Sequence, residues 1–130
     1  MASLSRQHFS HILARYCEAW RQQDADKILL IFTEDATYHE RLLEKPIVGH
    51  AGIRDYWVSK VVQGQANINV RVVNEFVDGN VGIAEWEVHF DDRVKRIRKF
   101  MREIAIMEFR GDRIKSLREY WVSKELGAIA

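Results

Sequence analysis

The fold is decided by the stretch Gly111-Asp112-Arg113-Ile114-Lys115-Ser116-Leu117-Arg118-Glu119-Tyr120-Trp121. It follows a long apolar strand across an Arg-Gly-Asp turn, which predicts a closing β-strand. Alternate side chains of a strand point to opposite faces, so Leu117, Glu119 and Trp121 share one face. A carboxyl between leucine and tryptophan loses water if that face is covered, and desolvation raises its pKa and suits it to general acid or base work. The alternative for Glu119 is a structural ion pair with an arginine on a neighbouring strand.

The first part of the chain predicts three helices. Ser5 is a plausible cap for the first helix, which ends near Gln22, and either Asp24 or Asp26 can cap the short second helix. The third follows Gly49 and stops near Gly64. The apolar stripes of the three helices are Phe9, Ile12, Leu13, Tyr16 and Trp20; then Ile28, Leu29, Ile31 and Phe32; then Ile53, Tyr56, Trp57 and Val61.

A short strand is expected at 36–40, after the second helix is ended by Thr33-Glu34-Asp35. On a strand, Tyr38 and Glu40 share a face and His39 takes the other. The sequence therefore places a tyrosine and a carboxylate on the same side. The alternative is that Glu40 merely sits at a solvated strand end.

The second part of the chain predicts long antiparallel strands. The segment 67–77 is rich in valine and isoleucine, Asp78-Gly79-Asn80 is a hairpin signal, and 81–90 alternates apolar and polar residues. A further long strand runs to about Phe109. Helices followed by such a meander indicate an α+β fold, with the helices on one face of a curved antiparallel sheet.

One face of the segment 81–90 carries Glu85, Glu87 and His89. This row is either a polar pocket wall, which would make the three residues substrate-binding, or a solvent-facing row, because an antiparallel sheet can leave one face wet. The set resembles metal ligands, but it spreads over roughly 13 Å along a strand. We therefore expect no metal site.

A dense basic stretch covers Arg93, Lys95, Arg96, Arg98, Lys99 and Arg102. Its residues alternate across both sides of a strand, with little aromatic interleaving, which favours a solvated hairpin flank over a nucleic-acid site. An electrostatic gate for an anionic ligand is the second interpretation.

Composition narrows the class of protein. The 130 residues are 47% hydrophobic and 30% charged, with a formal net charge of +1, which is typical of a globular domain and gives no argument for nucleic acid. The single cysteine, Cys17, cannot form an internal disulfide. Neither a signal-peptide core nor an apolar run long enough to span a bilayer is present, so we expect one cytoplasmic domain over 1–130 that acts away from membranes.

These features together resemble the nuclear transport factor 2-like superfamily. The resemblance covers about 8–123 and is strongest to the SnoaL-like branch, with steroid delta-isomerase similar in layout. It rests on Arg15-Tyr16, Asp24, Ile31-Phe32, Asp35-Ala36-Thr37, Gly49, Ile53-Arg54 and the closing Leu-Arg-Glu-Tyr-Trp. It implies a cone-shaped sheet wrapped around the helices (the cystatin-like α+β barrel), with an inner pocket and an outer face used for dimerisation.

The resemblance also implies roles for particular residues. Tyr16 matches the first-helix tyrosine that donates to an oxyanion in steroid delta-isomerase, and Glu40 falls at its general base. The position of its second oxyanion acid holds Ala105. Glu119 matches the last-strand acid of SnoaL-like polyketide cyclases and of limonene epoxide hydrolases.

The sequence thus leads to three hypotheses. The first is a cofactor-independent enzyme that uses Glu119, Glu40 and Tyr16 for isomerisation, aldol cyclisation or epoxide hydration of a small hydrophobic substrate. The second is a non-catalytic protein that binds a small ligand, and the third is a dimeric scaffold. In all three we expect a homodimer through the outer sheet face. The residues expected to line the pocket are Trp20, Tyr38, Tyr56, Trp57, Glu85, Glu87, His89, Leu117 and Trp121.

Overall fold

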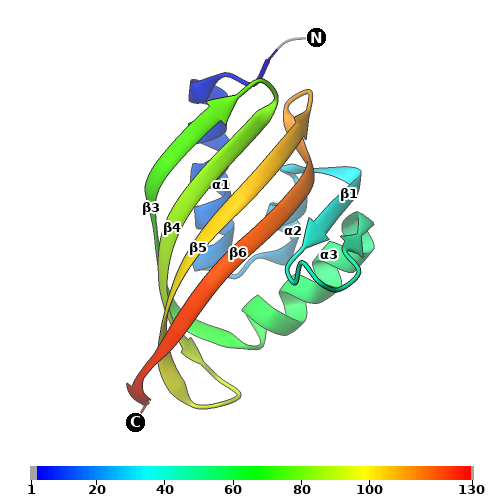
Figure 1. The fold of residues 1–130 in the computed structure, drawn as a ribbon. Helices are drawn as coiled ribbons and strands as arrows, with labels where there is room; N and C mark the ends of the chain where they lie inside the picture. The colour runs from blue at the N-terminus through cyan, green and yellow to red at the C-terminus, as the bar shows by residue number, and fades with distance from the viewer. Residues whose placement is uncertain (1–2, 130) are drawn as a thin grey trace.

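A computed structural model describes residues 3–129, and its six strands form one curved sheet in the order β2-β1-β6-β5-β4-β3. The helices pack against one face of this sheet (Figure 1). The helices are α1 (Arg6–Gln22), α2 (Ala25–Leu29) and α3 (Gly49–Trp57), the last continued by the π-helical turn η1 (Val58–Val62). The strands are β1 (Phe32–His39), β2 (Ile47–Val48), β3 (Gln65–Asp78), β4 (Val81–Asp92), β5 (Ile97–Arg110) and β6 (Arg113–Ala128).

The first helix forms as the sequence predicts. The Ser5 hydroxyl accepts a hydrogen bond from the His8 backbone N–H at 3.0 Å, and Gln23 ends α1 in a left-handed conformation. The apolar stripe of α1 is buried. Within residues 3–129 no helix is both long and apolar enough to cross a membrane.

The second helix is shorter than predicted, and β1 begins earlier. Asp24 caps α2, but the helix ends at Leu29, and Phe32 already belongs to β1. The Ile31 carbonyl accepts a hydrogen bond from the Ile114 N–H at 2.8 Å. The backbone at this point therefore bonds to the start of β6, which a helical pattern in the local sequence does not reveal.

The sheet has the predicted α+β character but is mixed. Strands β3 to β6 form antiparallel pairs, and the turn between β3 and β4 lies at Gly79-Asn80. Strand β1 runs parallel to β6, with Tyr38 opposite Leu117, and pairs with the short strand β2 on its other side. This parallel pairing places Tyr38 next to the stretch that contains Glu119.

The inner face of the sheet forms the core with the helices. Ala84, Trp86, Val88 and Phe90 of β4 are buried on this face, as their alternation predicts. Gly82 lies under α1, because a Cβ built there would come within 2.4 Å of the Phe9 ring. A glycine at this position therefore lets α1 approach the sheet closely.

Candidate active site

A cavity of about 560 Å³ lies between the inner face of the sheet and the helices. Its volume falls in the range of small-molecule sites. Five aromatic residues that the sequence predicted as pocket walls all line it: Trp20, Tyr38, Tyr56, Trp57 and Trp121. The cavity is thus an aromatic chamber built from α1, β1, α3 and β6.

Two carboxyl groups, Glu103 of β5 and Glu119 of β6, lie together in this chamber and form the acid pair of the site. The side chains are 3% and 6% exposed, and the two carboxyls hydrogen-bond to each other. Glu103 is opposite Trp121 in the ladder, and Ala105 is opposite Glu119. The two acids are therefore diagonal neighbours on one face of an antiparallel pair, a position set by strand register.

Each member of the acid pair has its own hydrogen-bond donor. The Tyr38 hydroxyl donates to Glu119 Oε1 at 2.6 Å, and the Tyr16 and Tyr38 hydroxyl oxygens are 3.0 Å apart. The Trp86 indole Nε1–H donates to Glu103 Oε2. The result is a continuous buried network from Tyr16 to Trp86 that passes through both carboxyls.

Burial controls the protonation of the acid pair. Desolvation is the main cause that raises the pKa of Glu103 from 4.5 to about 7. Desolvation, followed by the charge of Glu103, raises the pKa of Glu119 well above its ordinary value. Glu103 accepts from Trp86 and from Glu119, as an anion would, so near neutral pH Glu119 is the protonated member and Glu103 the ionised one.

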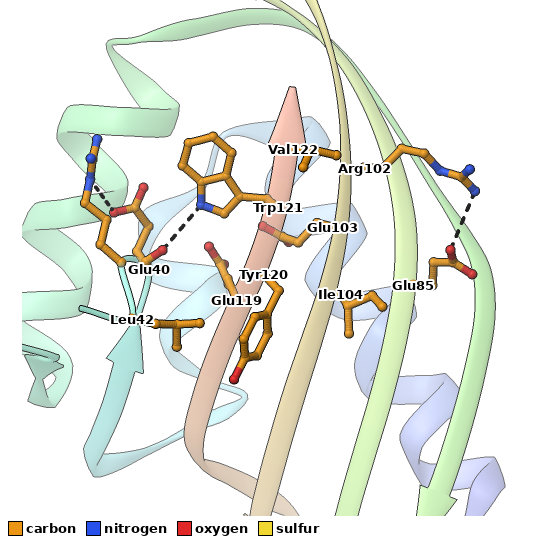
Figure 2. A pocket seen from close by; sticks show the side chains of 11 residues that line it. Glu40, Leu42, Glu85, Arg102, Glu103, Ile104, Glu119, Tyr120, Trp121 and Val122 are labelled. Carbon is orange, nitrogen blue, oxygen red and sulfur yellow. Dashed lines mark hydrogen bonds and ion pairs between the residues drawn. The ribbon is translucent and has the colours of Figure 1, made fainter. Parts of the chain in front are cut away.

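Glu40 lies at the rim of the chamber rather than in the network. Its side chain is 16% exposed and pairs with Arg41, with Nε and Oε2 3.3 Å apart. The Trp121 indole donates to the Glu40 backbone carbonyl at 3.3 Å, an interaction drawn in Figure 2. Tyr38 and Glu40 both line the cavity, although β1 ends at His39 and Glu40 lies just beyond it.

A second hollow, of about 540 Å³, crosses β6 next to this rim. Figure 2 shows Tyr120 and Glu119 on opposite sides of β6, and both belong to this hollow. The two hollows share five lining residues, Glu40, Arg41, Glu103, Glu119 and Trp121. The acid pair therefore lines both the aromatic chamber and a gap at the exposed edge of β6.

Comparison with known proteins assigns this chain to a family. The family model described as SnoaL-like domain matches residues 13–117, which is more than half of the chain. This chain belongs to the SnoaL-like family. The predicted superfamily and fold class are thereby confirmed.

Solved structures share the fold of this SnoaL-like protein. SalBIII, described as an epoxide hydrolase/cyclase-like enzyme in pyran ring formation of the polyether salinomycin, has a TM-score of 0.80 and 21% identity, covering 96% of this chain and 98% of its own. A hypothetical protein from Catenulispora acidiphila with a ketosteroid isomerase-like fold, in complex with trimethylamine, has a TM-score of 0.75 and 16% identity, covering 84% and 83%. Among curated proteins, none matches this sequence significantly.

Not every predicted site residue of the SnoaL-like protein reaches the chamber. Glu85, Glu87 and His89 point to the outer face of the sheet, because Trp86 and Val88 take the inner face. Glu87 pairs with Arg71 and Arg102, Glu85 lies 3.6 Å from Arg102, and the His89 ring stacks on Phe100. Glu87 and His89 therefore face away from both hollows, whereas Glu85 lines the second hollow from the outer face of the sheet. Leu117 is fully buried in the core and lines neither hollow.

Glu103 is the site residue that sequence reasoning missed. The acid in β5 lies two residues before Ala105, the position expected from the resemblance to steroid delta-isomerase, and on the same face of the strand. A signal was present, because a strand over this stretch places Glu103 on one face with Met101, Ala105, Met107 and Phe109. A single carboxyl within an otherwise apolar face is the same pattern that pointed to Glu119.

Removal of the Tyr38 hydroxyl should destabilise the SnoaL-like protein. Tyr38→Phe leaves Glu119 without its tyrosine donor and Tyr16 without its hydroxyl partner, and a buried polar group left unpaired costs about 1–3 kcal/mol. Urea denaturation at neutral pH measures the change. Tyr120→Phe is the matched control. Tyr120 is 49% exposed, so the free energy of unfolding of this variant should hardly change. Equal stability of the two variants would contradict a structural role for the network.

Proposed function

We propose that this SnoaL-like protein is a cofactor-independent acid–base enzyme that acts on a small hydrophobic substrate. The observation that carries the proposal is the acid pair, two carboxyls buried together inside an aromatic chamber, where burial and the proximity of the two groups raise both pKa values and favour one shared proton. A neutral carboxyl beside an ionised one offers a donor and an acceptor at the same place. The fold alone supports no single reaction, because one fold hosts many chemistries.

Epoxide opening uses both members of the pair. Glu119 gives its proton to the epoxide oxygen as a carbon–oxygen bond breaks. Glu103 takes a proton from water, or from a hydroxyl of the substrate, as the new carbon–oxygen bond forms at the ring carbon. The pair ends with one proton as it began, now on Glu103, and transfer along the hydrogen bond between the carboxyls restores the starting state.

Isomerisation or aldol cyclisation of an enolisable ketone uses the same groups. Glu103 removes a proton from the carbon next to the carbonyl, and Glu119 protonates the oxygen as the enol forms. Glu103 then gives its proton to the γ carbon of the isomer, or to the acceptor oxygen of the aldol as the carbon–carbon bond forms, and Glu119 takes back the enol proton. Tyr38 orients Glu119 through its 2.6 Å hydrogen bond, and Tyr16 orients Tyr38. In this proposal Tyr16 acts through Tyr38 rather than on the substrate, and Glu40 acts through its charge at the rim.

Two features favour the enzyme over the scaffold. A scaffold would be expected to have a filled interior and Glu119 tied to an arginine. Here Glu119 bonds to Tyr38 and Glu103, and the interior holds a cavity of about 560 Å³. SalBIII, which is described as epoxide hydrolase/cyclase-like, supports epoxides as the first substrates to test.

Isotope labelling tests the proposal and does not require the product to be identified first. The protein is incubated with hydrophobic epoxides and with β,γ-unsaturated ketones, once in ¹⁸O-labelled water and once in D₂O. Mass spectrometry then detects ¹⁸O in a diol, which reports hydration, or deuterium next to a carbonyl, which reports proton transfer. Unlabelled, unchanged compounds that still bind the protein in native mass spectrometry would favour the non-catalytic ligand-binding alternative.

We further propose that the protein dimerises through the outer face of the sheet. This face exposes several large apolar side chains, and monomeric proteins seldom leave such patches uncovered. Phe76, Ile104, Tyr120 and Val122 are between 42% and 70% exposed there. The residues come from β3, β5 and β6, so a partner would cover the middle of the sheet.

Ile104→Asp should convert the protein to a monomer. A carboxylate at the centre of a twofold interface lies close to its own copy, and like charges there cost several kcal/mol, so the dissociation constant should rise about 100-fold or more. Size-exclusion chromatography with light scattering measures the mass at micromolar concentration. Leu43→Asp is the control, because Leu43 is a fully exposed loop residue. A wild-type protein that is already monomeric would contradict the proposal.

A further inference from the structure

The mouth of the aromatic chamber carries positive charge from four separate places in the fold. Four cationic side chains line the cavity: Arg41 after β1, Lys60 of η1, Lys95 in the turn between β4 and β5, and Lys99 of β5. Arg41, Lys60 and Lys95 are exposed, whereas the acid pair is buried. The cations therefore mark the solvent end of the cavity and the acid pair its inner end.

The two carboxylates at the mouth are already engaged. Glu40 pairs with Arg41 at 3.3 Å. Asp92 pairs with Lys99 at 3.0 Å and also accepts hydrogen bonds from the backbone N–H groups of Val94 and Lys95 at 2.9 and 3.0 Å. The hydrogen bonds to Asp92 hold the turn between β4 and β5 in place. The ion pairs with Arg41 and Lys99 neutralise the two negative charges of the rim.

Lys60 and Lys95 remain without a counter-charge. Neither ammonium group forms an ion pair with any side chain in the part of the chain that the structure describes, residues 3–129. They reach the cavity from two different segments, η1 and the turn that follows β4, which the hydrogen bond from the Arg93 N–H to the Gly64 carbonyl (2.9 Å) holds next to each other. An anionic group placed between them would meet two unneutralised cations.

Apolar side chains supply much of the cavity lining. Trp20, Val61, Phe90 and Met101 are among them. A molecule that fits the whole cavity therefore has an apolar body and one charged end. A molecule bound the other way round would place its anion beside Glu103, where the two negative charges repel in a medium of low dielectric constant.

We propose that the substrate carries an anionic group, a carboxylate or a phosphate, which Lys60 and Lys95 hold at the mouth while the apolar body extends to the acid pair. The inference rests on the proposed function and adds the substrate class to it. The anion fixes the orientation of the substrate, so that the reactive carbon faces Glu103 and Glu119. Positioning of this kind removes rotational freedom before the chemical step.

Three ten-carbon probes test the inference: decanoate, decyl phosphate and the neutral decanamide. Three tryptophans line the cavity, so intrinsic fluorescence reports binding directly. Wild-type protein is compared with Lys60→Gln/Lys95→Gln and with Lys45→Gln/Lys115→Gln, which removes the same charge at two lysines outside the cavity lining. All titrations are run at low and at high salt.

The wild-type protein and the control variant should bind an anionic probe about tenfold more tightly than decanamide at low salt, as two partly exposed ion pairs would give. The Lys60→Gln/Lys95→Gln variant should bind the anionic and neutral probes equally, and high salt should abolish the wild-type preference. The ratio of decanoate to decyl phosphate affinity then identifies the anion. Equal affinity of wild-type protein for anionic and neutral probes would overturn this inference alone, whereas no binding of any probe would overturn the proposed function with it.

Discussion

The free energy of unfolding should fall by at least about 3 kcal/mol, the share expected from Glu103 alone, as the pH is raised from about 5 to about 8. The cause is the acid pair, in which burial raises the pKa of Glu103 to about 7 and the pKa of Glu119 further still. Between the pKa of the unfolded chain, near 4.5, and that of the folded protein, the folded state binds more protons. The stability that this provides is fully present below the unfolded pKa and is lost as the pH rises through about 7.

Denaturant titrations at several pH values measure this loss, and substitution assigns it. Glu103→Gln/Glu119→Gln removes both titrating groups and should make the curve flat over this range. Glu34→Gln, at an exposed site, should leave the slope unchanged. The aspartates with lowered pKa, Asp91 and Asp92, lose their contribution only in more acidic solution and do not interfere. Wild-type stability that is constant or rises over the range would show that the acid pair does not share a proton.

Glu119→Gln should lower turnover by about 10²- to 10⁴-fold once a substrate is found, because it removes the general acid. The glutamine can still accept a hydrogen bond from Tyr38 and donate one to Glu103, so the fold should persist and the Michaelis constant should change little. Steady-state kinetics with circular dichroism separates the two effects. Glu87→Gln, on the outer face of the sheet and outside both hollows, is the matched control and should retain wild-type turnover.

The pH profile adds a readout that a purely structural role would not change. Wild-type turnover should fall below about pH 7, as Glu103 becomes protonated and can no longer act as a base. Glu103→Gln should lose this acidic limb along with most of the activity. Full turnover in Glu119→Gln would remove that residue from the mechanism.

The alternation and helical spacing of the sequence were enough to identify Glu119 and the aromatic residues of the site. Leu117, Glu119 and Trp121 share a face because of strand alternation, and the helical spacing of Tyr16 and Trp20 predicted their burial. The apolar face of its strand marks Glu103 as a candidate, but its pairing with Glu119 depends on the register between β5 and β6, which no local pattern encodes. The basic residues that flank Glu103 also made its strand resemble a solvated hairpin.

The same limit applies to the fold. The hairpin at Gly79-Asn80 follows from turn chemistry, whereas the parallel pairing of β1 with β6 joins segments about 80 residues apart. That pairing brings Tyr38 to Glu119. Alternation also could not decide which face of β4 was covered, and only the packing of Trp86 against α1 resolved the position of Glu85, Glu87 and His89.

The two carboxyls and the outer part of the cavity come from different parts of the architecture. Glu103 and Glu119 are fixed by the ladder between β5 and β6, while Lys60 and Lys95 lie on a helical turn and a hairpin turn. Substitutions in those turns can alter the size or charge of accepted molecules without moving the proton donor and acceptor. For protein engineering, η1 and residues 93–96 are therefore the segments to randomise when new selectivity is sought, and β5 and β6 are the segments to leave intact.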